Sequence, residues 1–336
     1  MIDCDLFRLD GETVLVTGAS GFLGSHLCPA LTASGANVQA LVRGGAAQAL
    51  SGVSRVFPGE LHDRHGLRAA LRGATAVVHL AGRAHLRSES SDPARTELNR
   101  VNAEGTDSLI DEVLRSDVRL FVQVSSVAAM TGASDEVISE ATPARPVTAY
   151  GMSKLAGDQV VSERCSQAGI NYAILRPPMI YGPGMKGNPL QLFRLVHRGV
   201  PLPVAGIRNQ RTLLYVGNFV EAVKALLSAQ PLQSGYYLVG DRESVSTPDL
   251  VRIVARALNV RPRLVTFPEF LLRWAGLLGD AFEGRAFLPT ARQVEQLFGS
   301  LVVDSSLLKR ATGFRQEFSI AEGMKTTADW YLATRR

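Results

Sequence analysis

The stretch TVLVTGASGFLGSHL, residues 13–27, determines the fold class of this chain. Its first five residues are β-branched or apolar, which predicts a strand covered on both faces. Its last residues follow a helical pattern, and three glycines stand between the two. The stretch therefore predicts the strand, tight turn and helix that open a βαβ unit.

The same alternation of short apolar runs and longer helical patterns continues toward the C-terminus. Further strands are predicted at 37–42, 75–80, 119–126 and 171–176. Helical segments between successive strands are typical of a parallel sheet. We therefore expect an α/β fold with a Rossmann-type doubly wound parallel sheet over residues 1–176.

A smaller α/β C-terminal lobe for the substrate is predicted over residues 177–336, with room for some of its segments to return to the sheet. The boundary follows from RPPMIYGPGMKGNP (176–189), where Pro and Gly replace the regular pattern. In this lobe Thr247 is predicted as the N-cap of a helix, with Pro248 at its first position. The apolar stretch at 267–282 suits a helix of this lobe better than a membrane contact, because it is short and carries charges.

Composition excludes several classes of protein. The net charge of +5 is spread over 336 residues without a basic run, which favours small anionic ligands over nucleic acid. No window of about 20 apolar residues is present, so we expect no membrane insertion and a cytoplasmic location. Cys4, Cys28 and Cys165 are far apart, and neither a disulfide nor a metal site is predicted.

The three glycines have the spacing G-x-x-G-x-x-G and the context of a dinucleotide-binding turn. Gly18 allows the tight turn, Gly21 lets the backbone approach a pyrophosphate, and Gly24 lets the helix close on the strand. We expect the intervening residues to share in cofactor binding: Ser20, Phe22 and Leu23.

The end of the second strand indicates which dinucleotide is bound. An acid that would bind the ribose 2′-hydroxyl of NAD is absent; Val42 stands there, followed by Arg43. Arginine suits a 2′-phosphate, so we favour NADP(H), with NAD(H) as the alternative. Arg43 could also be a solvated loop residue.

The stretch TAYGMSKLAG (148–157) places Tyr150 and Lys154 one helical turn apart. In isolation such a pair is most simply a phenol packed on a lysine stem at the surface. A tyrosine that works near pH 7 needs its pKa lowered by about three units, roughly 4 kcal/mol. A single positive charge about 4 Å from the phenol supplies about that much free energy at an effective dielectric constant near 20. Lys154 could be that charge, so the pair could also serve a tyrosine that exchanges a proton.

The ordered set TGASGFLG, VVHLAG, VNAEGT, VSS, YGMSK and LRPPMIYGPG resembles the extended short-chain dehydrogenase/reductase family, in its sugar-nucleotide (epimerase/dehydratase) branch. The resemblance covers nearly the whole chain. It is strongest to a bacterial UDP-glucose 4-epimerase-like subgroup that includes 4-keto-sugar reductases of surface-polysaccharide pathways.

This resemblance implies roles for matching positions. Tyr150 would be the acid/base, Lys154 would bind the nicotinamide ribose and lower the tyrosine pKa, and Ser126 would hydrogen-bond the reacting sugar oxygen. Further residues implied at the cofactor are Glu60, Leu61, Leu80, Ala81, Gly82, Asn102 (in a supporting role) and Pro177.

Substrate contacts are expected from two parts of the chain. Asn188 and Arg211 match family positions that contact the nucleoside and diphosphate. Arg83 and His85 follow a strand's C-terminal end, where ligands collect. Two departures from the family pattern are Glu60 in place of Asp and Met179 in place of Asn.

These features favour an NADPH-dependent reductase of a nucleotide-linked, UDP-activated 4-keto-6-deoxy sugar. The alternative is a UDP-hexose 4-epimerase with a retained NAD. A 4,6-dehydratase is disfavoured because Val127 and Ala128 stand where that class has Asp-Glu. A non-catalytic NADP(H) sensor is disfavoured because Tyr150 and Lys154 are both kept. A homodimer through helices at about 92–116 and 149–168 is implied by the resemblance.

Overall fold

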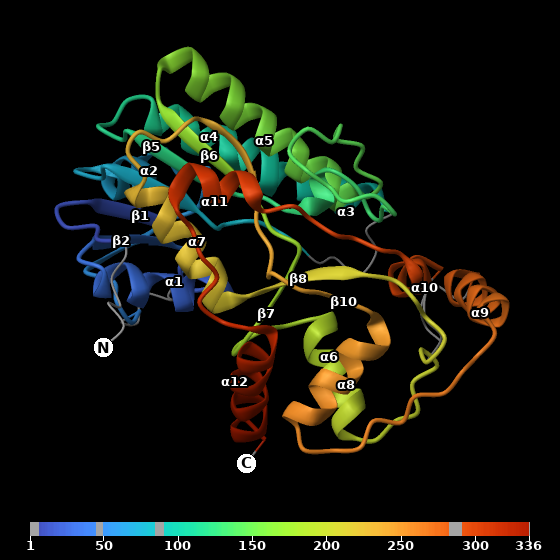
Figure 1. Ribbon diagram of the computed structural model, residues 1–336. Helices are drawn as coiled ribbons and strands as arrows, with labels where there is room; N and C mark the ends of the chain where they lie inside the picture. The colour runs from blue at the N-terminus through green and yellow to red at the C-terminus, as the bar shows by residue number, and fades with distance from the viewer. Residues whose placement is uncertain (1–6, 45–49, 85–90, 282–290, 336) are drawn as a thin grey trace.

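The computed structural model describes residues 7–44, 50–84, 91–281 and 291–335 (Figure 1). Seven parallel strands form the main sheet in the order β3-β2-β1-β4-β5-β6-β9. Their bounds are β1 Thr13–Thr17, β2 Asn37–Val42, β3 Arg55–Pro58, β4 Ala76–His79, β5 Leu120–Val124, β6 Asn171–Arg176 and β9 Gly235–Leu238. The Rossmann-type fold is confirmed, and the five predicted strands are present.

Helices cover both faces of this sheet (Figure 1). On one face lie α1 (Phe22–Ala33), α7 (Val216–Ser228) and α11 (Ser306–Thr312). On the other lie α2 (Arg64–Leu71), α3 (Asp92–Asn99), α4 (Gly105–Val113) and α5 (Ala149–Ala168). Alternate residues of β1 enter the two cores: Val14 and Val16 pack with the α1–α7 layer, and Leu15 packs with the α2–α4–α5 layer. This two-sided burial explains why the strands have continuous apolar sequences.

The C-terminal lobe is built around a three-stranded sheet in the order β10-β8-β7. Its strands are β7 (Met179–Tyr181), β8 (Arg211–Tyr215) and β10 (Ser244–Val245). Its helices are α6 (Asn188–His197), α8 (Thr247–Ala257), α9 (Glu269–Ala281), α10 (Ala291–Phe298) and α12 (Ile320–Ala333). No helix in the described ranges combines the length and the hydropathy needed to cross a bilayer.

The predicted start of α8 is wrong by one residue. Ser246 is the N-cap, and its hydroxyl accepts a hydrogen bond from Asp249 N at 3.2 Å. Thr247 is instead the first helical residue, which places Pro248 second. Either hydroxyl residue can cap a helix, so the local sequence does not choose between them.

His79 ends β4 and is 1% exposed. Its Nδ1 lies 2.6 Å from Thr17 Oγ1, and its Nε2 lies 3.2 Å from Thr106 Oγ1. Burial, with a smaller contribution from the nearby Lys154 charge, lowers the pKa of His79 to about 3. His79 is therefore a neutral core residue that links β4 to β1 and to α4.

We predict that His79 contributes to acid sensitivity. Below pH 6.5 the unfolded chain binds a proton at this histidine, whereas the folded protein does not until about pH 3. As the pH is lowered from 6.5 to about 3, the free energy of unfolding should therefore fall by up to about 1.4 kcal/mol per pH unit. In His79→Gln, urea denaturation at a series of pH values should show a shallower fall. The exposed control His65→Gln should follow the wild type; equal slopes in all three proteins would contradict the prediction.

Candidate functional site

The turn between β1 and α1 packs against the end of β4 through backbone atoms. Gly18 has φ +73°, and a Cβ there would lie 2.8 Å from Ala81 N. A Cβ at Gly24 would lie 2.4 Å from Ala19 O, inside the same turn. Gly21 is the N-cap of α1 and adds no side chain at its N-terminus. The turn thus has the bare backbone and the helix N-terminus that suit a pyrophosphate.

A cavity of about 340 Å³ lies at this turn, beside the C-terminal ends of β1, β2, β3 and β4. This is where strand order reverses in a doubly wound sheet and where ligands bind. Predicted residues that line it are Gly18, Ser20, Gly21, Arg43, Glu60, Leu61, Leu80, Ala81, Gly82 and Arg83. The side chains of Phe22 and Leu23 pack against the hydrophobic cores instead, so these two residues offer backbone amides.

The cavity also contains Arg100, which sequence reasoning missed. Glu97 lies beside it and pairs with Arg100 at 2.9 Å and with Arg83 at 3.6 Å. These arginines hold the pKa of Glu97 below its usual range, through the Arg100 hydrogen bond most of all. In the described part of the chain, Arg43 forms no ion pair. Its charge still acts on Glu97 and helps to lower the pKa of that carboxyl.

Helix α5 presents the Tyr150–Lys154 pair. The Thr148 hydroxyl caps the helix by accepting from Gly151 N at 2.9 Å. Two glycines let the helix approach its neighbours: a Cβ at Gly151 would lie 2.1 Å from Ala128 O, and one at Gly157 would lie 2.3 Å from Asn102 O. No side chain larger than hydrogen fits at either point. These two close contacts therefore fix the position of α5 and its rotation about its own axis, relative to Ala128 and Asn102.

Lys154 is buried, and its Nζ donates to Val124 O at 2.8 Å, at the end of β5. A Cβ at Gly82 would lie 3.8 Å from the same Nζ, so the ammonium reaches the cavity wall. Burial lowers the pKa of Lys154, and the Asp158 charge opposes this. An ammonium has three donors, and Val124 uses one of them.

Asn102 connects the cavity wall to α5. It lies in a π-helical turn, Arg100–Glu104, between α3 and α4. Its Oδ1 accepts from Arg83 N at 2.8 Å, while its Nδ2 donates to Arg83 O and to Ser153 Oγ, both at 2.9 Å. Asn102 therefore holds the loop after β4 against the helix that carries Tyr150 and Lys154.

Ser126 lies just past the end of β5 and is half-buried. Its Oγ accepts from Ala128 N at 3.1 Å and caps a short 3₁₀ turn, Val127–Ala129. The Pro177 carbonyl accepts from Val127 N at 2.9 Å, which places the start of the second lobe beside this serine.

The remaining predicted substrate residues are spread over other elements. Asn188 is exposed at the start of α6. Arg211 begins β8, donates to Gly299 O at 2.8 Å, and has its pKa lowered by burial. His85 lies outside the described residues. The roles given to Asn188, Arg211 and His85 stay predictions.

A buried ionic cluster behind Lys154 was not predicted. Asp158 lies one helical turn after Lys154, and its Oδ2 accepts from Ser125 Oγ at 2.8 Å and from Arg176 Nε at 3.0 Å. Asp158 and Arg176 are both buried. Burial raises the pKa of Asp158, while the charges of Arg176 and Lys154 lower it. The i, i+4 spacing from Lys154 was the one sequence signal that could have shown this acid.

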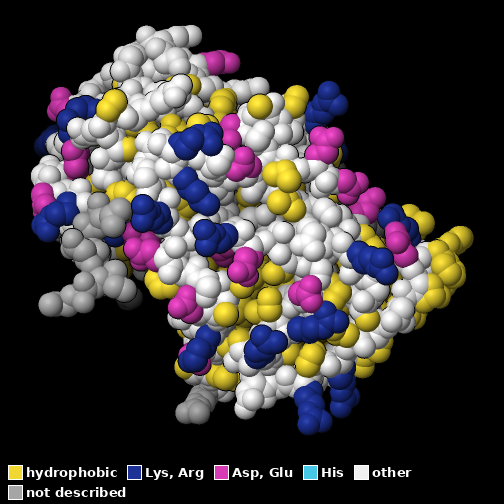
Figure 2. Space-filling model, viewed as in Figure 1, with side chains coloured by type: hydrophobic (Ala, Val, Ile, Leu, Met, Phe, Trp, Pro, Cys, Tyr) yellow, Lys and Arg dark blue, Asp and Glu magenta, His cyan; other side chains and the backbone are white. Residues whose placement is uncertain are grey.

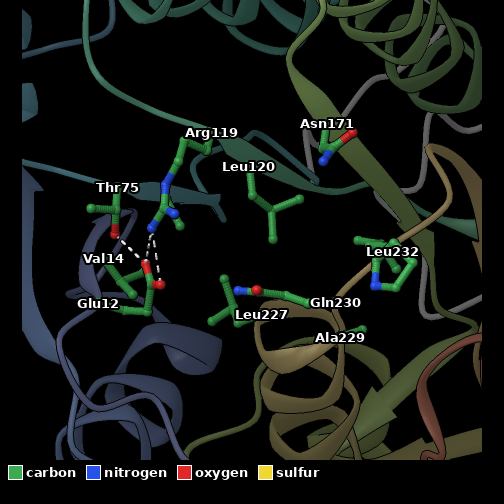
Figure 3. Close-up of a pocket in the computed structure, with 12 residues that line it drawn as sticks. Glu12, Val14, Thr75, Arg119, Leu120, Asn171, Leu227, Ala229, Gln230 and Leu232 are labelled. Carbon is green, nitrogen blue, oxygen red and sulfur yellow. Dashed lines mark hydrogen bonds and ion pairs between the residues drawn. The ribbon is translucent and has the colours of Figure 1, made fainter.

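A second cavity, of about 250 Å³, lies at the opposite edge of the sheet (Figure 3). Its lining residues lie at the N-terminal ends of β1, β4, β5 and β6, whereas ligands of parallel sheets bind at the C-terminal ends of the strands. Its charged groups face each other: Arg119 pairs with Glu12 at 3.0 Å, and Thr75 donates to Glu12. This pairing leaves little charge to bind a phosphate.

Comparison with known proteins agrees with this geometry. Residues 14–240 match the model of the NAD dependent epimerase/dehydratase family. The chain belongs to this family. The resemblance inferred from the ordered motifs is thereby confirmed, and the chain is an enzyme of the epimerase/dehydratase type.

Three known proteins that are similar to this chain carry different names. UDP-glucose 4-epimerase of Vibrio cholerae is 29% identical over 329 residues, 96% of either chain. Ceramide reductase of Caulobacter vibrioides is 28% identical over 326 residues, which are 95% of this chain and 94% of the relative. The solved structure of MoeE5 in complex with UDP-glucose and NAD has a TM-score of 0.78 and 26% identity, and the match covers 96% of this chain and 100% of MoeE5.

We predict that Asp158 positions and charges the site through Lys154. In Asp158→Asn the Lys154 pKa should fall, because the nearby negative charge is lost. The alkaline limb of the activity–pH profile should then move to lower pH. Asp158→Ala should also lower the free energy of unfolding by about 3–5 kcal/mol, since Arg176 stays buried without its partner.

The matched control is Ser125→Ala, which removes a hydrogen bond to Asp158 but no charge. Its alkaline limb should stay at the wild-type pH. An unchanged limb in Asp158→Asn, measured on folded protein, would show that Asp158 acts on stability alone.

Proposed function

We propose that this protein is an NADPH-dependent reductase that acts at C4 of a nucleotide-linked, UDP-activated 4-keto-6-deoxy sugar. The observation that carries the cofactor preference is the end of β2. The residue at this end is Val42, which is 3% exposed and packs in the core. This position therefore offers no carboxylate to bind a ribose 2′-hydroxyl. The next residue, Arg43, is exposed and lines the cavity beside the glycine turn.

The neighbouring charges support the same preference. Arg83 and Arg100 both pair with the single carboxylate of Glu97, so a net positive charge remains at this wall of the cavity. Arg43 adds a further guanidinium at the same wall, and guanidinium groups bind phosphate oxygens in pairs. A reductase exchanges its cofactor in each turnover, and NADP is the nicotinamide cofactor kept reduced for synthesis.

The chain's own residues account for the proton chemistry. A bound nicotinamide would supply the hydride. Tyr150 would donate its phenolic proton to the alkoxide that forms at C4, and Ser126 would hold that oxygen by a hydrogen bond. Lys154 would keep a positive charge next to the phenol. The Val124 carbonyl fixes the position of its Nζ, and the Asp158 charge offsets part of the lowering of the Lys154 pKa that burial causes.

A 4-epimerase with a retained NAD is the second candidate. It is favoured by the Vibrio cholerae relative and by the NAD in the MoeE5 structure. The same three residues, Ser126, Tyr150 and Lys154, would serve that reaction. The two functions differ in whether cofactor leaves the protein and whether it is consumed.

The substrate and the reaction are tested together by NADPH absorbance at 340 nm. We predict that a UDP-4-keto-6-deoxy-N-acetylhexosamine oxidises NADPH, and that Tyr150→Phe abolishes this. Interconversion of UDP-glucose and UDP-galactose without added cofactor, with NAD found in purified protein, would establish the epimerase instead. Activity that survives in Tyr150→Phe would remove this tyrosine from the mechanism.

The cofactor preference is tested by Arg43→Ala. Loss of a charged hydrogen-bond donor to phosphate costs about 1.5–3 kcal/mol, so KM for NADPH should rise about tenfold to a hundredfold while KM for NADH changes little. Arg119→Ala removes the same charge at the opposite edge of the sheet and should leave both KM values unchanged (Figure 3). Equal effects of Arg43→Ala on the two cofactors would contradict the preference.

A further inference from the structure

Within the part of the chain that the structure describes, helix α9 carries an apolar face with exposed side chains. Phe270, Trp274 and Leu277 are 60%, 65% and 59% exposed. Their spacing of i, i+4 and i+7 places them on one side of the helix. Figure 2 shows hydrophobic side chains gathered over the projecting end of the C-terminal lobe where α9 and α10 lie.

Contacts on the other sides of α9 fix this orientation. Leu272 is 8% exposed and faces inward. The Arg273 guanidinium lies 5.8 Å from the centre of the Phe298 ring on α10, and Arg273 also pairs with Glu269 at 2.7 Å. The helix is therefore held with Phe270, Trp274 and Leu277 toward solvent.

Exposed apolar side chains also lie on the chain before α9. Residues 261–266 run beside residues 199–205: Leu202 N donates to Arg263 O at 2.8 Å, and Val265 N donates to Leu202 O at 2.9 Å. We call the combined surface the α9 patch; it consists of the exposed side chains of Val200, Val265, Phe267, Phe270, Leu271, Trp274 and Leu277. Single exposed apolar residues are ordinary, whereas several of them on one helix and the chain leading into it indicate an interaction surface.

The charges around the α9 patch indicate its partner. Segments 194–208 and 261–281 contain two acids, Glu269 and Asp280, and six exposed arginines: Arg194, Arg198, Arg208, Arg261, Arg263 and Arg273, the last of which pairs with Glu269. A second copy of the chain would bring the same positive charge against it, which opposes a symmetric contact. An anionic bilayer complements both features, because Trp, Phe and Leu enter the interface while arginines contact lipid phosphates.

We propose that the α9 patch docks this protein on an anionic membrane surface. Phe270, Trp274 and Leu277 enter the headgroup region, and the surrounding arginines face the lipid phosphates. The sequence favours a lobe helix at 267–282 over a membrane contact. We keep α9 in the lobe and reverse the second part of that expectation, because α9 also forms a membrane-facing side. The contact is peripheral and requires neither substrate nor cofactor.

The tryptophan content gives a direct test. The chain has two tryptophans, so Trp330→Phe leaves Trp274 as the sole reporter. With vesicles of phosphatidylglycerol and phosphatidylcholine in equal parts, Trp274 emission should shift to the blue and the protein should sediment with the vesicles. Pure phosphatidylcholine should bind much less, and added salt should weaken binding to the mixed vesicles.

Phe270→Ser in the Trp330→Phe background should lower the vesicle partition coefficient about tenfold. Val147→Ser is the matched control, because Val147 is 67% exposed but lies outside the α9 patch. It should leave the partition coefficient unchanged. Circular dichroism would verify that each variant is folded.

Three results would overturn the proposal. The first is no emission shift and no sedimentation with either vesicle type. The second is equal binding by Phe270→Ser and its parent. The third is a dimer in solution that Phe270→Ser converts to monomer, which would make the α9 patch a contact between copies of the chain.

Discussion

The hydrogen bond from Lys154 to the Val124 carbonyl joins the two parts of the molecule on which its chemistry depends. It ties the helix that carries Tyr150 to the end of a central strand, next to the cavity wall at Gly82. The bond can form only because Gly151 and Gly157 let α5 approach backbone atoms at Ala128 and Asn102. A buried ammonium needs a compensating charge, which Asp158 supplies, and Ser125 and Arg176 hold that carboxylate in place by donating to it.

The strands that could be predicted are those buried on both faces, since their apolar runs are unbroken. β1, β2 and β6 were located at their observed bounds, and β4 and β5 within about two residues. β3 was missed because it is a short strand at the edge of the sheet, partly exposed along its length. β9 is four residues long, and nothing in Gly235–Leu238 indicates a partner strand far back in the sequence.

In the site, too, residues that belong to a short sequence motif could be predicted, whereas residues brought together by packing could not. The glycine turn and the Tyr150–Lys154 spacing are local patterns, so they could be recognised before the structure was known. Arg100 was missed because a π-helical turn brings it to the cavity, and such turns have no simple sequence signal. The pairing of Asp158 with Arg176 joins a helix to the following strand, and only the packing of the two elements reveals it.

The position of β9 has a consequence for how the chain can be divided. β9 pairs with β6 and completes the main sheet, although residues 177–234 separate them in sequence. Its terminal amide, Leu238 N, donates in turn to Glu140 at 2.8 Å. A chain cut after residue 176 would leave β6 as a bare apolar edge and would lose α7 from one face. The nucleotide-binding half is therefore not a separable module: ribosomal synthesis must pass well into the second lobe before the first can close.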